Sequence, residues 1–164
     1  MHHNLQFEKK RFIEEVGLLF EQTGLPRMAG RILGWLLIAD PPHQTTSDLT
    51  EALLASKASI STVTRLLIRI GLIERISLPG ERRDYFRIRS GAWHQHFKES
   101  LAQTTATRQL AERGLELLEG DAHLNRQWLE EMRDMYAFFE REFPALMERW
   151  EQEHKLKQMT GKIE

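Results

Sequence analysis

Residues 47–89 read SDLTEALLASKASISTVTRLLIRIGLIERISLPGERRDYFRIR and decide how this chain folds. The segment opens on a short helical pattern over residues 48–55. Thr46 or Ser47 can cap this helix, because hydroxyl side chains accept hydrogen bonds from the free N–H groups of a first helical turn. A second helical pattern follows after a break of a few residues, so the segment begins as a helix-turn-helix unit.

The second helix is expected to begin between residues 56 and 59 and to stop at Gly71. Residues 72–78 and 84–89 are two β-rich runs, and PGERR at 79–83 supplies turn residues between them. These runs predict a β-hairpin. Two helices followed at once by a hairpin are the arrangement of a winged helix-turn-helix, whose second helix enters the major groove of DNA.

Two further helices are expected before this segment. Apolar residues at helical spacing predict one over residues 5–22, ended by Gly24. Pro26 suits the first turn of the next helix, and the prolines that follow Asp40 stop it. The high apolar content of this second helix makes it the expected buried centre of the domain.

Two long helices are expected after the hairpin, over residues 92–119 and 123–155. The predicted fold class is therefore mainly α with a small β-hairpin: a winged helix-turn-helix plus long helices. Pro144 deletes one backbone donor, so we expect a kink or a short break near residues 137–143. The last helix carries an apolar seam of heptad type at Trp128, Met132, Met135, Phe139, Phe143, Leu146 and Trp150.

The seam has two interpretations. It can pack on the chain's own helices, as in a bundle. Proteins that bind operators usually have two-fold symmetry, which favours a homodimer of about twice the 19.3 kDa chain.

Composition narrows the class of protein. The chain has 164 residues, of which 41% are hydrophobic, and no cysteine, so disulfide scaffolds, thiolate zinc sites and cysteine-bound iron–sulfur clusters are excluded. Its apolar runs are too short to cross a bilayer, and the N-terminus lacks the pattern of a signal peptide. We expect a cytoplasmic protein with one domain, or a small domain with a dimerisation appendage.

Positive charge is concentrated in one segment. The whole chain has a formal net charge of −1, but residues 57–90 carry eight basic and three acidic side chains. The net charge of the whole chain is therefore a poor guide to its binding partners. The positive segment favours binding to a polyanion.

The second helix of the unit is amphipathic. Its apolar residues, such as Ile60 and Leu67, share one side, and its hydroxyl and basic residues face mainly outward. Small hydroxyls allow close approach to phosphates, and arginine can bind guanine or a phosphate. The alternative is an ordinary solvated face. The candidate DNA contacts of this helix are Lys57, Ser59, Ser61, Thr62, Arg65 and Arg69.

Arg82 and Arg83 stand at the expected hairpin tip. Glu81 or Asp84 can hold one of them while the other enters a narrow minor groove. A plain charged surface hairpin is the alternative. Together, the helix, the hairpin and the local positive charge favour binding to double-stranded DNA over a winged helix used only for protein contacts.

Other kinds of site are weakly indicated. An apolar effector site could be lined by Phe12, Val16, Leu19, Trp35, Trp93 and Phe97, although ordinary core packing is the better explanation of such residues. His94 and His96 point about 200° apart on a helix, so they do not share a metal ion. No catalytic motif is present, and no cofactor, metal site or enzymatic activity is expected.

Three stretches carry a family resemblance: PRMAGRILGWLL at 26–37, SISTVTRLL at 59–67 and GERRDYFRI at 80–88. Over roughly residues 8–140 the chain resembles the GbsR-like branch of the MarR-type transcriptional regulators. The general wing pattern of that family has Asp two residues before Arg, whereas this chain has Glu81 before Arg83.

The resemblance implies a homodimeric regulator, expected to be a repressor, that reads a pseudo-palindromic operator and is released by a small apolar effector. Residues 25–90 would form the DNA-binding domain, and residues 1–24 and 91–164 the helical dimerisation region. The recognition helix would be 59–70, with Arg82 or Arg83 as the wing-tip arginine.

Overall fold

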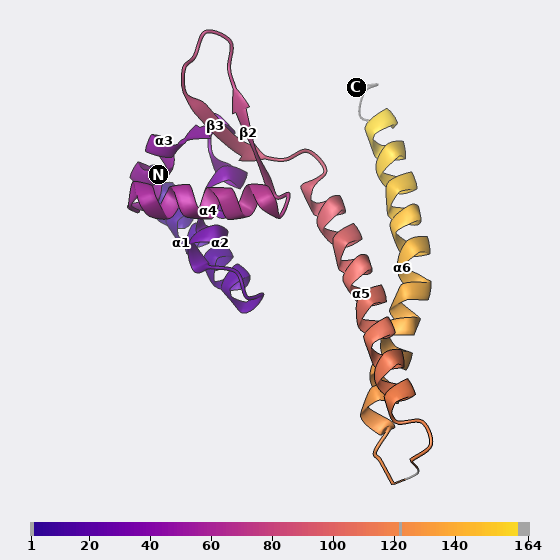
Figure 1. Cartoon of the computed structure of the whole chain (residues 1–164). Coiled ribbons are helices and arrows are strands. Elements are labelled where there is room, and N and C mark those ends of the chain that lie inside the picture. Colours follow the sequence, from indigo (N-terminus) through magenta and orange to yellow (C-terminus); the bar gives the residue numbers. More distant parts are fainter. Residues whose placement is uncertain (1, 122, 161–164) are drawn as a thin grey trace. The chain divides into compact units, whose positions relative to one another are not determined.

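The computed structural model describes residues 2–121 and 123–160 in two compact units, one that ends at His96 and one that begins at Phe97. The first unit holds α1 (His2–Gln22), α2 (Arg27–Ile38), β1 (Gln44–Thr45), α3 (Thr46–Leu53), α4 (Lys57–Arg69), β2 (Ile73–Ser77) and β3 (Asp84–Ile88). Figure 1 labels each of these except the short strand β1. Two long helices follow, α5 (Ala92–Leu117) and α6 (Gln127–Thr160). The predicted fold class is confirmed.

A three-stranded antiparallel sheet contains the predicted hairpin, with strand order β1-β3-β2. Ile73 lies opposite Ile88, and Ser77 opposite Asp84. The short strand β1 was not predicted: it pairs Gln44 with Phe86 and Thr45 with Tyr85. Two residues are too few to show the alternation by which strands are recognised, so only the pairing with β3 reveals β1.

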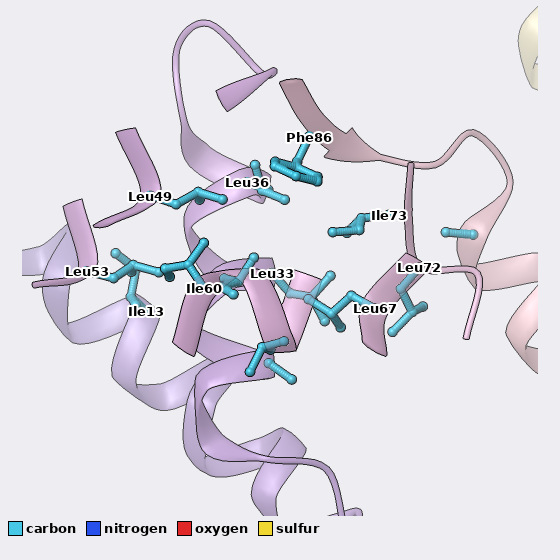
Figure 2. Close-up of a cluster of buried hydrophobic side chains, with 14 residues drawn as sticks. Ile13, Leu33, Leu36, Leu49, Leu53, Ile60, Leu67, Leu72, Ile73 and Phe86 are labelled. Atoms are coloured by element: carbon cyan, nitrogen blue, oxygen red, sulfur yellow. The ribbon is translucent and has the colours of Figure 1, made fainter. Parts of the chain in front are cut away.

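The core of the first unit is built around α2, as predicted. Ile32 and Leu33 are fully buried, and Leu36 is nearly so. Figure 2 shows α1, α3, α4 and the sheet each contributing apolar side chains to this cluster. Its other labelled members are Ile13, Leu49, Leu53, Ile60, Leu67, Leu72, Ile73 and Phe86.

Helices α1 and α2 approach closely because a glycine stands between them. A Cβ atom on Gly30 would lie 2.5 Å from the backbone oxygen of Val16 and 2.7 Å from Cα of Gly17. No side chain fits at such distances, so Gly30 permits the backbone contact that joins the first helix to the buried centre.

The helices end at the predicted glycines, but two residues at helix starts lie at other positions than predicted. Gly24 has φ +88° after α1, and Gly71 has φ +79° after α4, as C-terminal glycines do. Pro26 lies one position before α2, and not in its first turn. The cap of α3 is Thr45, and not Thr46 or Ser47, because Thr45 and Asp48 form a reciprocal capping box.

In the second unit, hydrogen bonds join α5 to α6. Arg108 donates to Glu140 on α6 and to Glu112 on its own helix, and Thr105 Oγ1 donates to Glu140 over 3.0 Å. The hydrogen bond from Arg108, and to a lesser extent that from Thr105, holds the pKa of Glu140 below its usual value. A kink or a short break was expected near residues 137–143. The break is wrong, because α6 runs without interruption past Pro144, and the kink stays a prediction.

No helix among the described residues is long and apolar enough to cross a membrane.

Candidate nucleic-acid interface

The outer face of α4 presents the predicted DNA contacts to solvent. Lys57, Ser61, Thr62, Arg65 and Arg69 are exposed, and Ser59 is half-buried. The opposite face carries Ile60 and Leu67 into the core, both fully buried. The helix therefore turns one apolar face inward and one hydroxyl and arginine face outward, as the sequence predicted.

The start of α4 is defined by its cap. Ser56 Oγ accepts a hydrogen bond from the backbone N–H of Ser59 over 3.1 Å. Thr64, in contrast, is buried and its hydroxyl donates to the Ile60 carbonyl over 2.8 Å. Its polarity is satisfied within the helix, so it takes no part in the exposed face.

The hairpin of β2, β3 and their loop, residues 73–88, is called the wing below. In Figure 1 its loop extends beyond the helices of the same unit. Arg82 and Arg83 are both exposed in this loop, which turns at Gly80 with φ +81°. Both predicted tip arginines are thus accessible to a ligand.

The predicted brace of a tip arginine by Glu81 or Asp84 was wrong. Asp84 Oδ2 pairs instead with Arg75 Nη1 across the hairpin, at 3.5 Å. In the part of the chain that the structure describes, Arg82 and Arg83 make no ion pair. Ser77 lies opposite Asp84, and Arg75 is two residues from Ser77, so the side chains of Arg75 and Asp84 project from the same face of the hairpin and can pair.

Arg83 leans toward the helix-turn-helix. It lines a polar hollow of about 490 Å³ together with Lys57, and Asp84 also borders it. Hydroxyl residues from the β1 and α3 segment complete the lining: Thr45, Thr46, Ser47 and Thr50. None of these four hydroxyl residues was predicted to line a site, although their position just before and within the first helix of the unit is a signal for them.

Asp48 stabilises the segment that forms this hollow. Its carboxylate accepts from the Thr45 backbone N–H over 2.8 Å and from the Thr45 hydroxyl over 2.7 Å. These two bonds lower the pKa of Asp48, and the positive charge of Arg83 adds to the effect.

The six residues predicted to line an effector site lie in different settings. Trp35 is half-buried against the core and donates from Nε1 to Gln44 Oε1 over 3.0 Å. Val16 is half-buried and faces Gly34 of α2. The remaining four are exposed in the single chain: Phe12, Leu19, Trp93 and Phe97. The role of these residues in binding an effector stays a prediction.

The predicted seam of α6 is largely exposed in one chain. Trp128 is 68% exposed, and Met132 and Phe143 are half-buried. The other exposed members are Met135, Phe139, Leu146 and Trp150, of which Trp150 stacks on His154. The role of the seam in dimerisation also stays a prediction.

Comparison with known proteins identifies the family. A family model described as MmpR5-like MarR family transcriptional regulator matches residues 91–153, and a model of the MarR family matches residues 23–84. The HTH-type transcriptional regulator MmpR5 of Mycobacterium tuberculosis is 45% identical over 130 residues, which are 79% of this chain and 78% of that protein.

Two further relatives agree. The HTH-type transcriptional repressor OpcR of Bacillus subtilis is 29% identical over 84 residues, 51% of this chain and 45% of that protein. A crystal structure of a transcriptional regulator matches with a TM-score of 0.74 and 39% identity, over 88% of this chain and 99% of that one. Membership of the GbsR-like branch stays a prediction. The helix-turn-helix, the wing and these similarities together show that the chain belongs to the MarR family of transcriptional regulators.

Proposed function

We propose that this regulator binds double-stranded DNA as a homodimer and represses transcription from a pseudo-palindromic operator. The observation that carries the proposal is the exposed hydroxyl and arginine face of α4 beside a wing whose tip arginines make no ion pair in the described residues. Buried apolar residues hold that face in place, so it is presented to DNA on a rigid element.

The contacts divide by chemistry. Ser59, Ser61 and Thr62 lie in the first half of α4, where small side chains let the helix enter the major groove. Arg65 is long enough for a bidentate hydrogen bond to guanine O6 and N7.

Phosphate contacts from Lys57, Arg69 and Arg83 would set the register on the duplex. Arg82, at the tip of the wing, would enter the minor groove. Arg83 lines the hollow beside Lys57, so it is the better placed of the two for the backbone.

Apolar surface that one chain leaves exposed supports the proposed homodimer. The seam of α6 includes Trp128 and Leu146, and α1 exposes Leu5, Phe7 and Leu19. Covering such residues in a second chain removes apolar area from water, and two-fold symmetry would set two α4 helices on successive major grooves. Light scattering at micromolar concentration should give about twice the 19.3 kDa chain mass; a monomer would contradict the dimer.

A small apolar effector would act by favouring one spacing of the two recognition helices over another. Phe12, Val16, Leu19, Trp35, Trp93 and Phe97 are the candidate lining. Operator affinity should then change with at least one member of an apolar compound library.

We assign the protein no enzymatic activity, because its relatives are transcriptional regulators. We also place it in the cytoplasm, where its DNA would be.

Fluorescence anisotropy tests the proposal. The protein is titrated against a duplex from upstream of its own gene and a scrambled duplex of equal length, at two salt concentrations. We expect tighter binding to the upstream duplex, and an affinity that falls as salt rises.

Two variants sharpen this experiment. Arg65→Gln should reduce the preference for the upstream duplex, whereas Arg113→Gln removes the same charge from an exposed position of α5 and should leave the preference unchanged. Absence of binding to either duplex at low salt would favour the second candidate, a winged helix that contacts only proteins.

A further inference from the structure

A second cationic surface lies at the C-terminal end of α4, away from the hollow beside Lys57. We call it the arginine groove: about 630 Å³, lined by Arg65, Ile68 and Arg69 of α4, Ile73, Glu74 and Arg75 of β2, and Arg89 just after β3. Figure 1 shows α4 leading through a short turn into β2, and residues of α4, of β2 and of the segment after β3 line the same groove.

Acidic groups do not neutralise this groove. Among the described residues that line the groove, Glu74 is the one acid, and it already accepts from Arg87 Nε over 2.7 Å. Arg75 is paired with Asp84. Within the described residues, Arg65, Arg69 and Arg89 have no ion-pair partner, and all three are exposed. Three such guanidinium groups beside one groove repel one another, and a bound anion would relieve that repulsion.

The backbone sets Arg89 against the end of the recognition helix. Its N–H donates to the Leu72 carbonyl over 3.1 Å. Its Nη1 atom lies 3.7 Å from the position that a Cβ on Gly71 would take. The Arg89 guanidinium therefore lies beside Gly71, in the turn that ends α4 and two residues beyond Arg69.

Guanidinium groups bind phosphate oxygens through paired N–H donors, so two of them at one place suit a phosphodiester. Helix α4 has 13 residues, which span about 20 Å at 1.5 Å per residue. The hollow beside Lys57 and Arg83 is at one end of this length and the arginine groove at the other. With α4 inserted in the major groove, the two sugar-phosphate backbones that border the groove would lie near the two ends of the helix.

We propose that Arg69 and Arg89 together hold one DNA backbone phosphate in the arginine groove, and so fix the depth and register of α4 on the duplex. This inference rests on the proposed DNA binding. It adds Arg89 as a positioning residue that touches the backbone and no base, and it gives Arg69 a partner.

Anisotropy titrations of the full chain over a series of salt concentrations test this, with the upstream and the scrambled duplex as probes. Arg89→Gln should weaken binding to both duplexes by the same several-fold factor. It should also lower the slope of log affinity against log salt by about 0.9 for each protomer bound. Arg89→Lys should restore most of the slope, and Arg113→Gln, on α5, should leave slope and affinity unchanged.

A shared phosphate also predicts coupling. The double variant Arg69→Gln/Arg89→Gln should lose less affinity than the product of the two single losses, because either change alone breaks the same contact. Circular dichroism and the urea midpoint should match the wild type and so exclude misfolding as the cause.

Each contrary outcome has its own meaning. An Arg89→Gln protein with wild-type slope and affinity overturns the inference and leaves the proposed function intact. A loss confined to the upstream duplex makes Arg89 a base contact and overturns it as well. A wild-type protein that binds neither duplex at low salt overturns the inference and the proposed function together.

Discussion

Arg31 on α2 donates from Nε to Glu14 Oε1 on α1 over 2.8 Å. The same guanidinium donates from Nη2 to the backbone carbonyl of Leu53 over 2.9 Å. Leu53 is the last residue of α3. One side chain therefore joins α1, α2 and the helix that precedes the recognition helix, and it is only 23% exposed.

Arg31→Gln is expected to lower the free energy of unfolding by about 1–2 kcal/mol, because Glu14 and the Leu53 carbonyl both lose a charged donor. Urea denaturation followed by circular dichroism measures this. Arg11→Gln is the matched control: it breaks an exposed ion pair with Glu15 on the same helix as Glu14 and should cost less than about 0.5 kcal/mol. Equal losses in the two variants would show that the three-helix link contributes nothing special.

Asp48→Asn should reveal a pH-dependent contribution of the capping box. The backbone N–H and hydroxyl of Thr45 lower the pKa of Asp48 below its ordinary 3.8 in the folded protein. A lowered folded pKa adds stability above the unfolded value, and this stability is lost as pH falls through the folded value.

At pH 7 the variant should therefore be less stable than the wild type by about 1 kcal/mol. The difference should shrink once pH drops below 3.8. Urea midpoints from pH 7 to pH 3 measure it. Thr45→Ser keeps the hydroxyl and should keep the wild-type profile, and a difference that grows with falling pH would refute the assignment.

Leu54→Gly is expected to stabilise the protein. Leu54 lies in the turn between α3 and α4 with φ +50°, in the left-handed region, and its side chain is 89% exposed. The Leu54 backbone is strained in this conformation, and removing its exposed side chain gives up almost no buried surface. Glycine also has the greater conformational entropy in the unfolded chain, which opposes the gain. The net effect of Leu54→Gly should be a rise of about 0.5 kcal/mol in the free energy of unfolding. Leu54→Ala keeps the strain and should not show this gain. A lower thermal midpoint for Leu54→Gly than for Leu54→Ala would count against the strain.

Arg82→Ala should weaken operator binding by about 1–3 kcal/mol through the lost minor-groove contact. Dimerisation should be unchanged, because the wing lies outside the proposed seam of α6. Anisotropy with the upstream duplex and light scattering measure the two effects. Unaltered affinity would mean that the wing tip does not enter the groove.

Much of the DNA-binding unit was predictable because its signals are local. The apolar spacing of Ile60, Val63 and Leu67 depends on residues three or four apart, and it set the exposed face of α4 correctly. Gly24 and Gly71 ended their helices as expected, because a left-handed residue at a helix end is a preference of single residues.

The misses involve choices that local signals leave open. Thr45, Thr46 and Ser47 can all cap a helix, and β1 pairing with β3 ends at Thr45 and makes it the cap. Pro144 favours a break in isolation, yet α6 continues through it beside α5.

The order of the residues alone predicts a helix-turn-helix with a basic wing, flanked by further helices on both sides in the sequence. Helix periodicity, turn residues and local charge can each be recognised within a few positions of the chain. Tertiary structure alone decided that Arg75 and not a tip arginine pairs with Asp84, and that Arg31 joins residues 17 and 22 positions away. It likewise placed Arg89 beside Arg69 at the end of α4. Such contacts depend on how separate elements pack, and no spacing along the chain records that packing.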